Sequence, residues 1–172
     1  ALQNVDFRLW PGEVHALMGE NGAGKSTLIK ALTGVYSVDS GVITIDGSEH
    51  SFSGPGEAQA AGVATVYQEV NRCDNLSVAE NIMLSHPPRL GGAINWRDPR
   101  RQARTYLDRM NLDIDPGSIL GTHSLAVQQL VAICRAMVVD AKVLILDEPT
   151  SSLDSDEVAQ LFAVIRSLRD EG

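Results

Sequence analysis

The chain has 172 residues, the size of one ordinary domain, and 44% of them are apolar while 21% are charged. This composition excludes an intrinsically disordered chain and a small disulfide-stapled protein. Fourteen lysines and arginines against 22 aspartates and glutamates give a formal net charge of −8, the wrong sign for gripping a nucleic-acid backbone. No stretch reaches the roughly 18 uninterrupted apolar residues that a membrane-spanning helix needs, so we expect no bilayer-crossing segment.

The first part of the chain predicts strands, a glycine-rich loop and a helix. Apolar patterning and turn residues predict strands over 5–9, 14–18, 42–45 and 63–67. The first two of these strands flank a turn at Pro11 and Gly12. A glycine-rich stretch then leads into a predicted helix over 25–32, and Gly34 stands where a helix carboxyl end favours glycine.

The middle of the chain, residues 77–139, predicts helices with no convincing strand between them. Residues 77–80 have the form of a capping box, in which a serine and a glutamate each satisfy a free amide of the first helical turn. Residues 98–99 supply an aspartate N-cap and a first-turn proline for a second helix. A third helix is expected over 124–139.

A strand signal returns at 143–146, a wholly apolar run typical of a strand buried on both faces of a parallel sheet. An amphipathic helix is expected after it, with an apolar stripe formed by Val158, Leu161, Phe162, Ile165 and Leu168. This order of elements predicts an α/β core that is interrupted by an all-helical insertion.

One stretch matches the phosphate-binding loop, whose pattern is G-x-x-x-x-G-K-S/T. Its members are Gly19, Glu20, Asn21, Gly22, Ala23, Gly24, Lys25 and Ser26. Because the loop joins an apolar strand to a helix, its amides can converge on phosphate oxygens at the positive end of the helix dipole. Lys25 would bridge the β- and γ-phosphates of ATP, Ser26 would bind Mg²⁺, and Thr27 would reach the α-phosphate. A plain glycine-rich turn is the alternative.

Two acids follow the predicted strand over 143–146. Asp147 and Glu148 stand at its carboxyl end, where a buried parallel strand can present carboxylates beside a phosphate loop. Asp147 would hold Mg²⁺ through water, and Glu148, which points differently, would polarise the attacking water as a general base. Without the loop, the same pair would be interpreted as a helix cap or a solvated turn.

Five motifs together resemble those of ABC-transporter ATPases in order and approximate spacing, over essentially the whole chain. They are the phosphate loop, Gln68 after a strand, 124–129 at the start of a helix, 146–150, and 151–154. Several shorter segments look like those of the monosaccharide importers of the ribose, galactose and galactofuranose type. They are 19–22, 66–69, 76–81, 94–96 and the glutamine pair at 128–129. The segment 131–136 looks closest to the galactofuranose branch.

The resemblance implies an α/β fold: a P-loop NTPase core with a mostly parallel sheet, a small antiparallel β part at the N-terminus and an all-helical inserted subdomain. It implies one ABC ATPase domain over 1–172. Residues 1–76 and 140–172 would form the nucleotide-binding core, and 77–139 the helical subdomain with its signature helix. The family's adenine-stacking aromatic would lie before residue 1 and its switch histidine after residue 172, so we expect a terminally truncated domain.

The resemblance also assigns roles to single residues. Gln68 would contact Mg²⁺ or water at the subdomain junction, although a lone glutamine is otherwise a surface residue. Ser124 and the amide of Ala126 would contact the γ-phosphate bound by a second subunit, although the sequence alone favours an ordinary helix N-cap for this stretch. Asp154 would communicate across the dimer, or cap the following helix.

The signature departs from the family pattern. Glycine is usual where Leu125 and Ala126 stand, and glutamine is usual where Val127 stands. A β-carbon therefore occupies positions that must approach a neighbour's phosphate. The four histidines do not match the switch position and are interpreted as surface or strand residues: His15, His50, His86 and His123.

The two cysteines, Cys73 and Cys134, form no C-x-x-C pair, which fits reduced thiols that bind no metal. Cys134 stands among apolar residues and is expected in the core.

We predict ATP binding and hydrolysis that power import of a monosaccharide across the bacterial inner membrane, with ATP and Mg²⁺ bound. The partners would be a second ABC ATPase domain (a homodimer or a fused tandem copy), transmembrane permease subunits and, indirectly, a periplasmic or extracellular sugar-binding protein. The location would be peripheral, at the cytoplasmic face, and the chain alone is expected to be weakly active or inactive. The alternatives are a non-transport ATPase of DNA repair or the ribosome, and a nucleotide-binding regulatory module without turnover.

Overall fold

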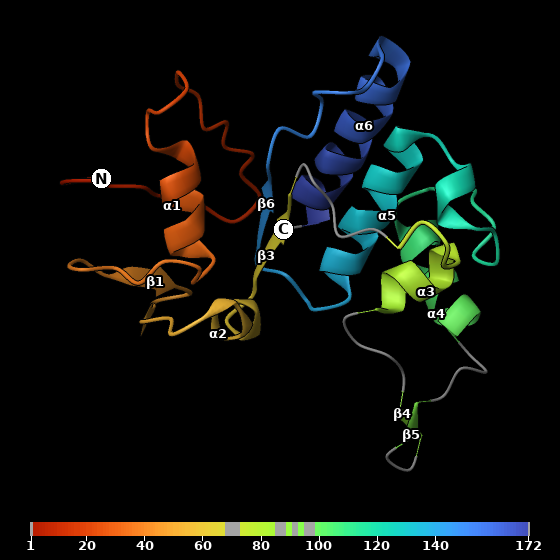
Figure 1. The fold of residues 1–172 in the computed structure, drawn as a ribbon, viewed down its shortest axis with the longest axis horizontal. Coiled ribbons are helices and arrows are strands. Elements are labelled where there is room, and N and C mark those ends of the chain that lie inside the picture. The colour runs from red at the N-terminus through yellow and green to blue at the C-terminus, as the bar shows by residue number, and fades with distance from the viewer. Residues whose placement is uncertain (1, 68–72, 85–88, 91–92, 95–98, 172) are drawn as a thin grey trace.

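The computed structural model describes residues 2–67, 73–84, 89–90, 93–94 and 99–171. Its elements are α1 (Lys25–Leu32), β1 (Ile43–Ile45), β2 (Ser48–His50), α2 (Pro55–Ala60), β3 (Val63–Val66), α3 (Val78–Met83), β4 (Arg89–Leu90), β5 (Ala93–Ile94), α4 (Pro99–Arg109), a 3₁₀ turn (Leu120–Thr122), α5 (Leu125–Met137), β6 (Val143–Leu146) and α6 (Ser155–Glu171). Figure 1 shows β3 and β6 at the centre, with α1, β1 and α2 on one side and α3 to α6 on the other.

The central strands β3 and β6 are parallel, with Val63 opposite Val143 and Val66 opposite Leu146. Their apolar side chains are buried or half-buried, as a strand covered on both faces requires. The predicted strands over 63–67 and 143–146 are therefore confirmed, and they form the parallel part of the predicted fold. A separate antiparallel pair joins β1 to β2, of which only β1 was expected.

The main core lies where α3, α4, α5 and α6 meet. Its largest side chains with under 2% exposure include Ile82, Leu107, Leu130, Ile133 and Leu161. Each such side chain contributes about 1.5–3 kcal/mol through burial, which is what holds these short helices in place. The expected helices of the insertion and the final helix are confirmed, because α3, α4, α5 and α6 cover the predicted positions.

Local signals place the ends of these helices. The Ser77 side chain accepts from the amide of Glu80, and the Glu80 carboxylate accepts from the amide of Ser77, so the capping box before α3 is formed. The Ser124 side chain caps α5 by accepting from the amide of Val127. The aspartate predicted to cap α4, Asp98, lies outside the described residues.

The strands expected over 5–9 and 14–18 are wrong for this structure, which assigns no strand there. The side chains of Val5 and Met18 are 52% and 85% exposed, and only Phe7 and Leu9 in the two segments are half-buried, so neither segment has a fully covered apolar face. Alternating residues form a strand only where a neighbour supplies ladder hydrogen bonds, and these segments have none. The turn between them is confirmed, since the Glu13 amide donates to the Trp10 carbonyl at 3.1 Å.

The insertion also holds a strand pair that we did not expect. β4 and β5 pair antiparallel, with Arg89 opposite Ile94 and Leu90 opposite Ala93. The two residues between these strands are Gly-Gly, which is a signal for a two-residue hairpin turn. We did not recognise it because the segments before and after it predict helices. Among the described residues, no helix has the length and apolar character needed to cross a membrane.

Candidate functional site

The glycine-rich loop before α1 adopts backbone conformations that favour glycine. Gly22 and Gly24 have φ values of 87° and 97°. The Ala23 amide donates to the Glu20 carbonyl at 3.1 Å, which closes a turn inside the loop. At Gly24 an added Cβ would also lie 2.7 Å from Cδ2 of Leu2. The sequence pattern therefore matches the backbone here, because left-handed φ costs an ordinary residue about 1–2 kcal/mol.

The amino end of α1 fits an anion. Its N-cap is Gly24, which offers no side-chain acceptor to the first-turn amides, and no acidic residue lies in that turn. Free amides at the positive end of a helix dipole favour a negative ligand such as phosphate. The predicted residues Ser26 and Thr27 lie in this first turn, exposed and half-buried respectively.

The ammonium group of Lys25 folds back over the loop. Its Nζ donates to the carbonyl oxygens of Gly19 at 2.5 Å and Glu20 at 3.0 Å. The side chain is therefore held above the start of the loop, where a lysine can act as a point charge on phosphate oxygens. Asn21, also predicted here, is exposed.

The acid pair continues directly from β6. The Asp147 amide donates to the Val66 carbonyl at 3.0 Å, so the ladder between β3 and β6 extends to this residue. Glu148 has a left-handed φ of 45°, and its carbonyl accepts from the Ser151 amide at 3.2 Å. The chain therefore turns sharply after Asp147, leaving that residue half-buried and Glu148 exposed. A left-handed non-glycine residue stores strain, which is common at functional sites.

The loop and the acid pair lie toward the same end of the molecule. Figure 1 shows the amino end of α1 and the carboxyl end of β6 both toward the upper edge of the view. Lys25 donates to loop carbonyls, not to Asp147. The Ser26 hydroxyl and the Asp147 carboxylate are hard oxygen donors, the ligand chemistry that Mg²⁺ prefers.

The predicted signature residues lie at the start of α5. Ser124 Oγ accepts from the Val127 amide at 3.4 Å, so the local N-cap interpretation holds. Ser124 and Leu125 are exposed, whereas the Ala126 side chain is only 2% exposed. Ser124 and Leu125 thus face outward at a helix amino end, and the small Ala126 side chain packs inward.

Gln68 and Asp154 are the other two residues that the resemblance singled out. Gln68 lies outside the described residues, just after the exposed Tyr67. Asp154 caps α6, because its Oδ1 accepts from the amides of Asp156 at 3.0 Å and Glu157 at 2.9 Å. The capping role left open for Asp154 is therefore formed.

The described histidines and cysteines have structural contacts. His123 Nε2 lies 2.6 Å from Ser118 Oγ, His15 Nδ1 lies 3.0 Å from Glu13 Oε1, and His50 stacks on Phe52. His86 lies outside the described residues. Both cysteines are free thiols, and burial raises the pKa of the Cys134 thiol to about 12, as its expected core position implies. Within the described chain no three histidine, cysteine or acidic side chains gather as a metal site.

Sequence reasoning missed a polar network under α5. Asn81, fully buried in α3, bonds through its side chain to the backbone of Cys73 and to the guanidinium of Arg135. Gln128 is also buried, and its Nε2 donates to the His123 carbonyl at 2.8 Å. The available signal was an asparagine at a core-facing position of an apolar helix, which demands hydrogen-bond partners.

The geometry defines an α/β domain with a phosphate-type loop and an acid pair at the end of a parallel strand. The family model for the ABC transporter matches residues 2–151, and the chain belongs to this family.

Curated relatives cover the chain completely. It is 61% identical over 173 residues to the fructose import ATP-binding protein FruK of Bifidobacterium longum, spanning all of this chain and 34% of that protein. It is 50% identical over 172 residues to the galactofuranose transporter ATP-binding protein YtfR of Escherichia coli K12, again spanning all of this chain and 34% of that protein. The chain therefore spans about a third of the length of these relatives.

A solved structure has the same fold. An ATP-binding cassette determined as a dimer in a post-hydrolysis state, bound to ADP and Pi, matches with a TM-score of 0.78 and 26% identity. The match covers 99% of this chain and 75% of that one. The ABC ATPase fold expected from the motifs is thereby confirmed.

Proposed function

We propose that the chain is the ATP-binding and ATP-hydrolysing domain of a bacterial monosaccharide importer. The observation that carries this proposal is the loop before α1, where left-handed glycines, first-turn amides without a side-chain cap and the Lys25 ammonium held by the Gly19 carbonyl would together bind an anion. The names of the relatives, which are import proteins for fructose and galactofuranose, support the sugar class.

The triphosphate of ATP would lie along this loop. Amides of 22–27 would donate to phosphate oxygens, Lys25 would exchange its two carbonyl partners for the β- and γ-phosphates, and Thr27 would reach the α-phosphate. This exchange is favourable because a phosphate oxygen carries more negative charge than a carbonyl oxygen.

Hydrolysis would use the acid pair. Glu148 would orient and polarise the attacking water, and Lys25 with the loop amides would stabilise charge that develops on the phosphate. Ser26, Gln68 and Asp147 would hold Mg²⁺, which neutralises phosphate charge when bound. The turn at Glu148 supports this division of roles, because Asp147 is half-buried at the strand end whereas Glu148 is exposed beyond it.

A second ATPase domain, as a homodimer or a fused tandem copy, would complete the site. The exposed amino end of α5 would offer Ser124 and the amide of Ala126 to the γ-phosphate held by that second domain. The cassette with the same fold that was solved as a dimer with ADP and Pi supports this arrangement.

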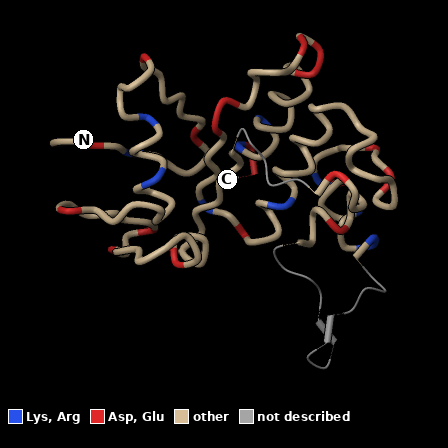
Figure 2. The backbone as a smooth tube through the Cα atoms, in the orientation of Figure 1, with Lys and Arg blue, Asp and Glu red and all other residues tan. Residues whose placement is uncertain are grey.

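The remaining partners follow from the import class. Transmembrane permease subunits would carry the sugar, a periplasmic or extracellular binding protein would deliver it, and this domain would be peripheral at the cytoplasmic face of the inner membrane. Figure 2 shows acidic positions spread over the whole described tube, which with the net charge of −8 disfavours a nucleic-acid partner.

The test is ATP titration and ATP turnover in the full-length protein that carries this sequence, with Lys25→Ala and Lys30→Ala compared. Both lysines lie in α1, but Lys30 is at its other end, over the ring of Tyr36. Lys25→Ala should abolish ATP binding while Lys30→Ala binds as the wild type does. Unchanged titration of Lys25→Ala, or a wild type that binds no ATP, would overturn the proposal.

A further inference from the structure

A partly buried hydrogen-bond network, built on the fully buried Asn81 and the half-buried Arg135, joins two helices of the described chain. The guanidinium of Arg135, on α5, donates twice to Asn81 on α3: Nε to the backbone carbonyl at 2.8 Å and Nη2 to Oδ1 at 3.1 Å. The two residues are 54 positions apart in sequence. The planar fork of arginine thus engages both the main chain and the side chain of one residue.

Asn81 passes this connection on to the turn before α3. Its Nδ2 donates to the carbonyls of Cys73 at 2.9 Å and Ser77 at 3.0 Å, while its Oδ1 accepts from the Cys73 amide at 3.1 Å. Asn81 is completely buried, so removing its side-chain amide would take a hydrogen-bond partner from both the amide and the carbonyl of Cys73. The 73–77 turn is therefore fixed to α3 and α5 together.

The same arginine also lines a cavity beside the central strand β3. Arg135 lines a cavity of about 270 Å³ together with Val66 and Tyr67 at the end of β3. The Arg135 guanidinium bonds to the Asn81 carbonyl in the last turn of α3. This contact is favourable because the carboxyl end of a helix carries partial negative charge. One side chain thus contacts α3 and faces the strand next to β6, which carries the acid pair.

We propose that Arg135 and Asn81 are positioning residues of the ATPase reaction, which hold α5, with Ser124 at its amino end, in the orientation that turnover requires. This inference rests on the proposed function. Among the described residues, these hydrogen bonds join the pair to each other and to the 73–77 turn rather than to the phosphate loop or the acid pair. The pair would therefore act on turnover through helix placement, and ATP binding to the loop should be independent of it.

The experiment measures kcat, KM for ATP and stoichiometric ATP binding in the full-length protein with its membrane partners. The variants are Arg135→Ala, Arg135→Lys, Asn81→Ala and the double Arg135→Ala/Asn81→Ala. We expect kcat to fall about tenfold or more in each single variant while each folded molecule still binds one ATP with wild-type affinity. The double variant should lose no more than either single one, because the two residues act as a unit.

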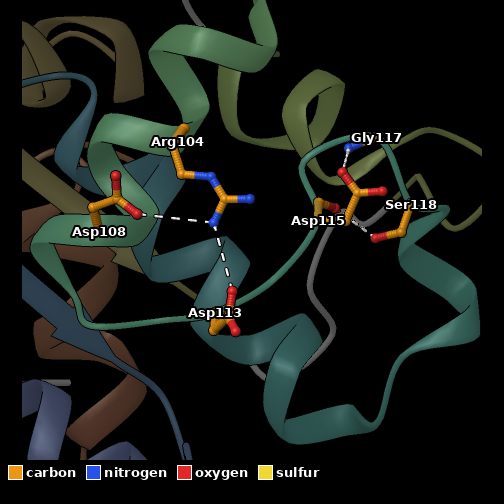
Figure 3. A network of polar contacts seen from close by, with 6 residues as sticks. All are labelled: Arg104, Asp108, Asp113, Asp115, Gly117 and Ser118. Atoms are coloured by element: carbon orange, nitrogen blue, oxygen red, sulfur yellow. Dashed lines mark hydrogen bonds and ion pairs between the residues drawn. The ribbon is translucent and has the colours of Figure 1, made fainter.

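Arg135→Lys keeps the positive charge and the aliphatic stem but not the fork, so it provides a folded variant even if Arg135→Ala fails to fold. The matched control is Arg104→Ala. Arg104 belongs to α4, which packs against both α3 and α5, and within the described residues its guanidinium makes two long ion pairs, 3.8 Å to Asp108 and 3.9 Å to Asp113 (Figure 3). The kcat of the Arg104→Ala variant should equal that of the wild type.

Three results would overturn the inference while leaving the proposed function intact. They are wild-type kcat in Arg135→Lys, a kcat that falls only in proportion to the fraction of molecules that bind ATP, and additive losses in the double variant. A wild-type protein without ATP binding or turnover would instead overturn the proposed function itself.

Discussion

The amide of Asp147 donates to the carbonyl of Val66 at 3.0 Å, so the β3–β6 ladder ends on the first of two acids. The next residue, Glu148, turns away with φ at 45°. One strand end thus gives two neighbouring carboxylates different surroundings. In the proposed function, this difference would allow one acid to hold a metal ion and the other to polarise water.

Replacing Glu148 with glutamine should separate ATP binding from hydrolysis. The amide keeps the shape of the side chain but cannot take a proton, so we expect turnover to fall by about 10²–10⁴-fold with ATP affinity retained. Steady-state phosphate release and ATP titration in the full-length protein measure both. Glu49→Gln, an exposed acid in β2, is the control. Wild-type turnover in Glu148→Gln would remove this residue from its role.

Gly24→Ala should weaken the phosphate loop. The residue has φ at 97° and an added Cβ would meet Leu2, so the substitution should cost about 1–2 kcal/mol of unfolding free energy and weaken ATP binding. Gly56→Ala in α2 is the matched control, because its φ is not left-handed and an added Cβ meets no atom within 4 Å. Denaturant unfolding and ATP titration compare the two. Equal effects would contradict the assigned role of the Gly24 backbone.

Ser77→Ala should destabilise the helical insertion by about 1 kcal/mol, because it breaks the capping box before α3. The hydroxyl and amide of Ser77 also hold the pKa of the Glu80 carboxyl below its ordinary value of 4.5. A lowered carboxyl pKa adds stability above the unfolded-state pKa and loses it as pH falls through the folded-state pKa. The difference between wild type and Ser77→Ala should therefore shrink at acid pH.

Urea unfolding at neutral pH and at about pH 3 measures this difference. Thr105→Ala is the control, since it removes an exposed hydroxyl from α4 that accepts no capping bond. A Ser77→Ala penalty that grows on acidification would have the wrong sign.

Cys134 should resist thiol reagents in the folded protein. Its side chain is 0% exposed, and burial raises its pKa to about 12 from an ordinary 9.0, so the reactive thiolate is scarce. The sign for stability follows: the unfolded thiol ionises first, so stability falls as pH rises above 9.0. Labelling with a chromogenic disulfide before and after unfolding, in a Cys73→Ser background, measures the reactivity. Rapid labelling of the folded protein would contradict the buried position.

Much of this fold could be predicted from local signals. Helix α3 was predicted by its capping box, α5 by Ser124 and its apolar face, and β6 by an unbroken apolar run. These signals work because the residues that determine each element lie within one or two turns of each other. The loop before α1 was predicted for the same reason, since its glycines fit the backbone they occupy.

Features that depend on distant partners could not be predicted in this way. The segments at 5–9 and 14–18 have a strand pattern but no pairing neighbour among the described residues, and all of their residues except Phe7 and Leu9 are exposed. The bond between Arg135 and Asn81 depends on the packing of α5 against α3, which no local pattern encodes.

The most direct test is a structure of the full-length protein with Mg²⁺ and a non-hydrolysable ATP analogue. The triphosphate should lie in the loop at 19–27, with Lys25 Nζ within hydrogen-bond distance of its terminal phosphates and Asp147 facing the bound Mg²⁺. A nucleotide bound elsewhere, with Lys25 still donating to Gly19 and Glu20, would contradict the central claim.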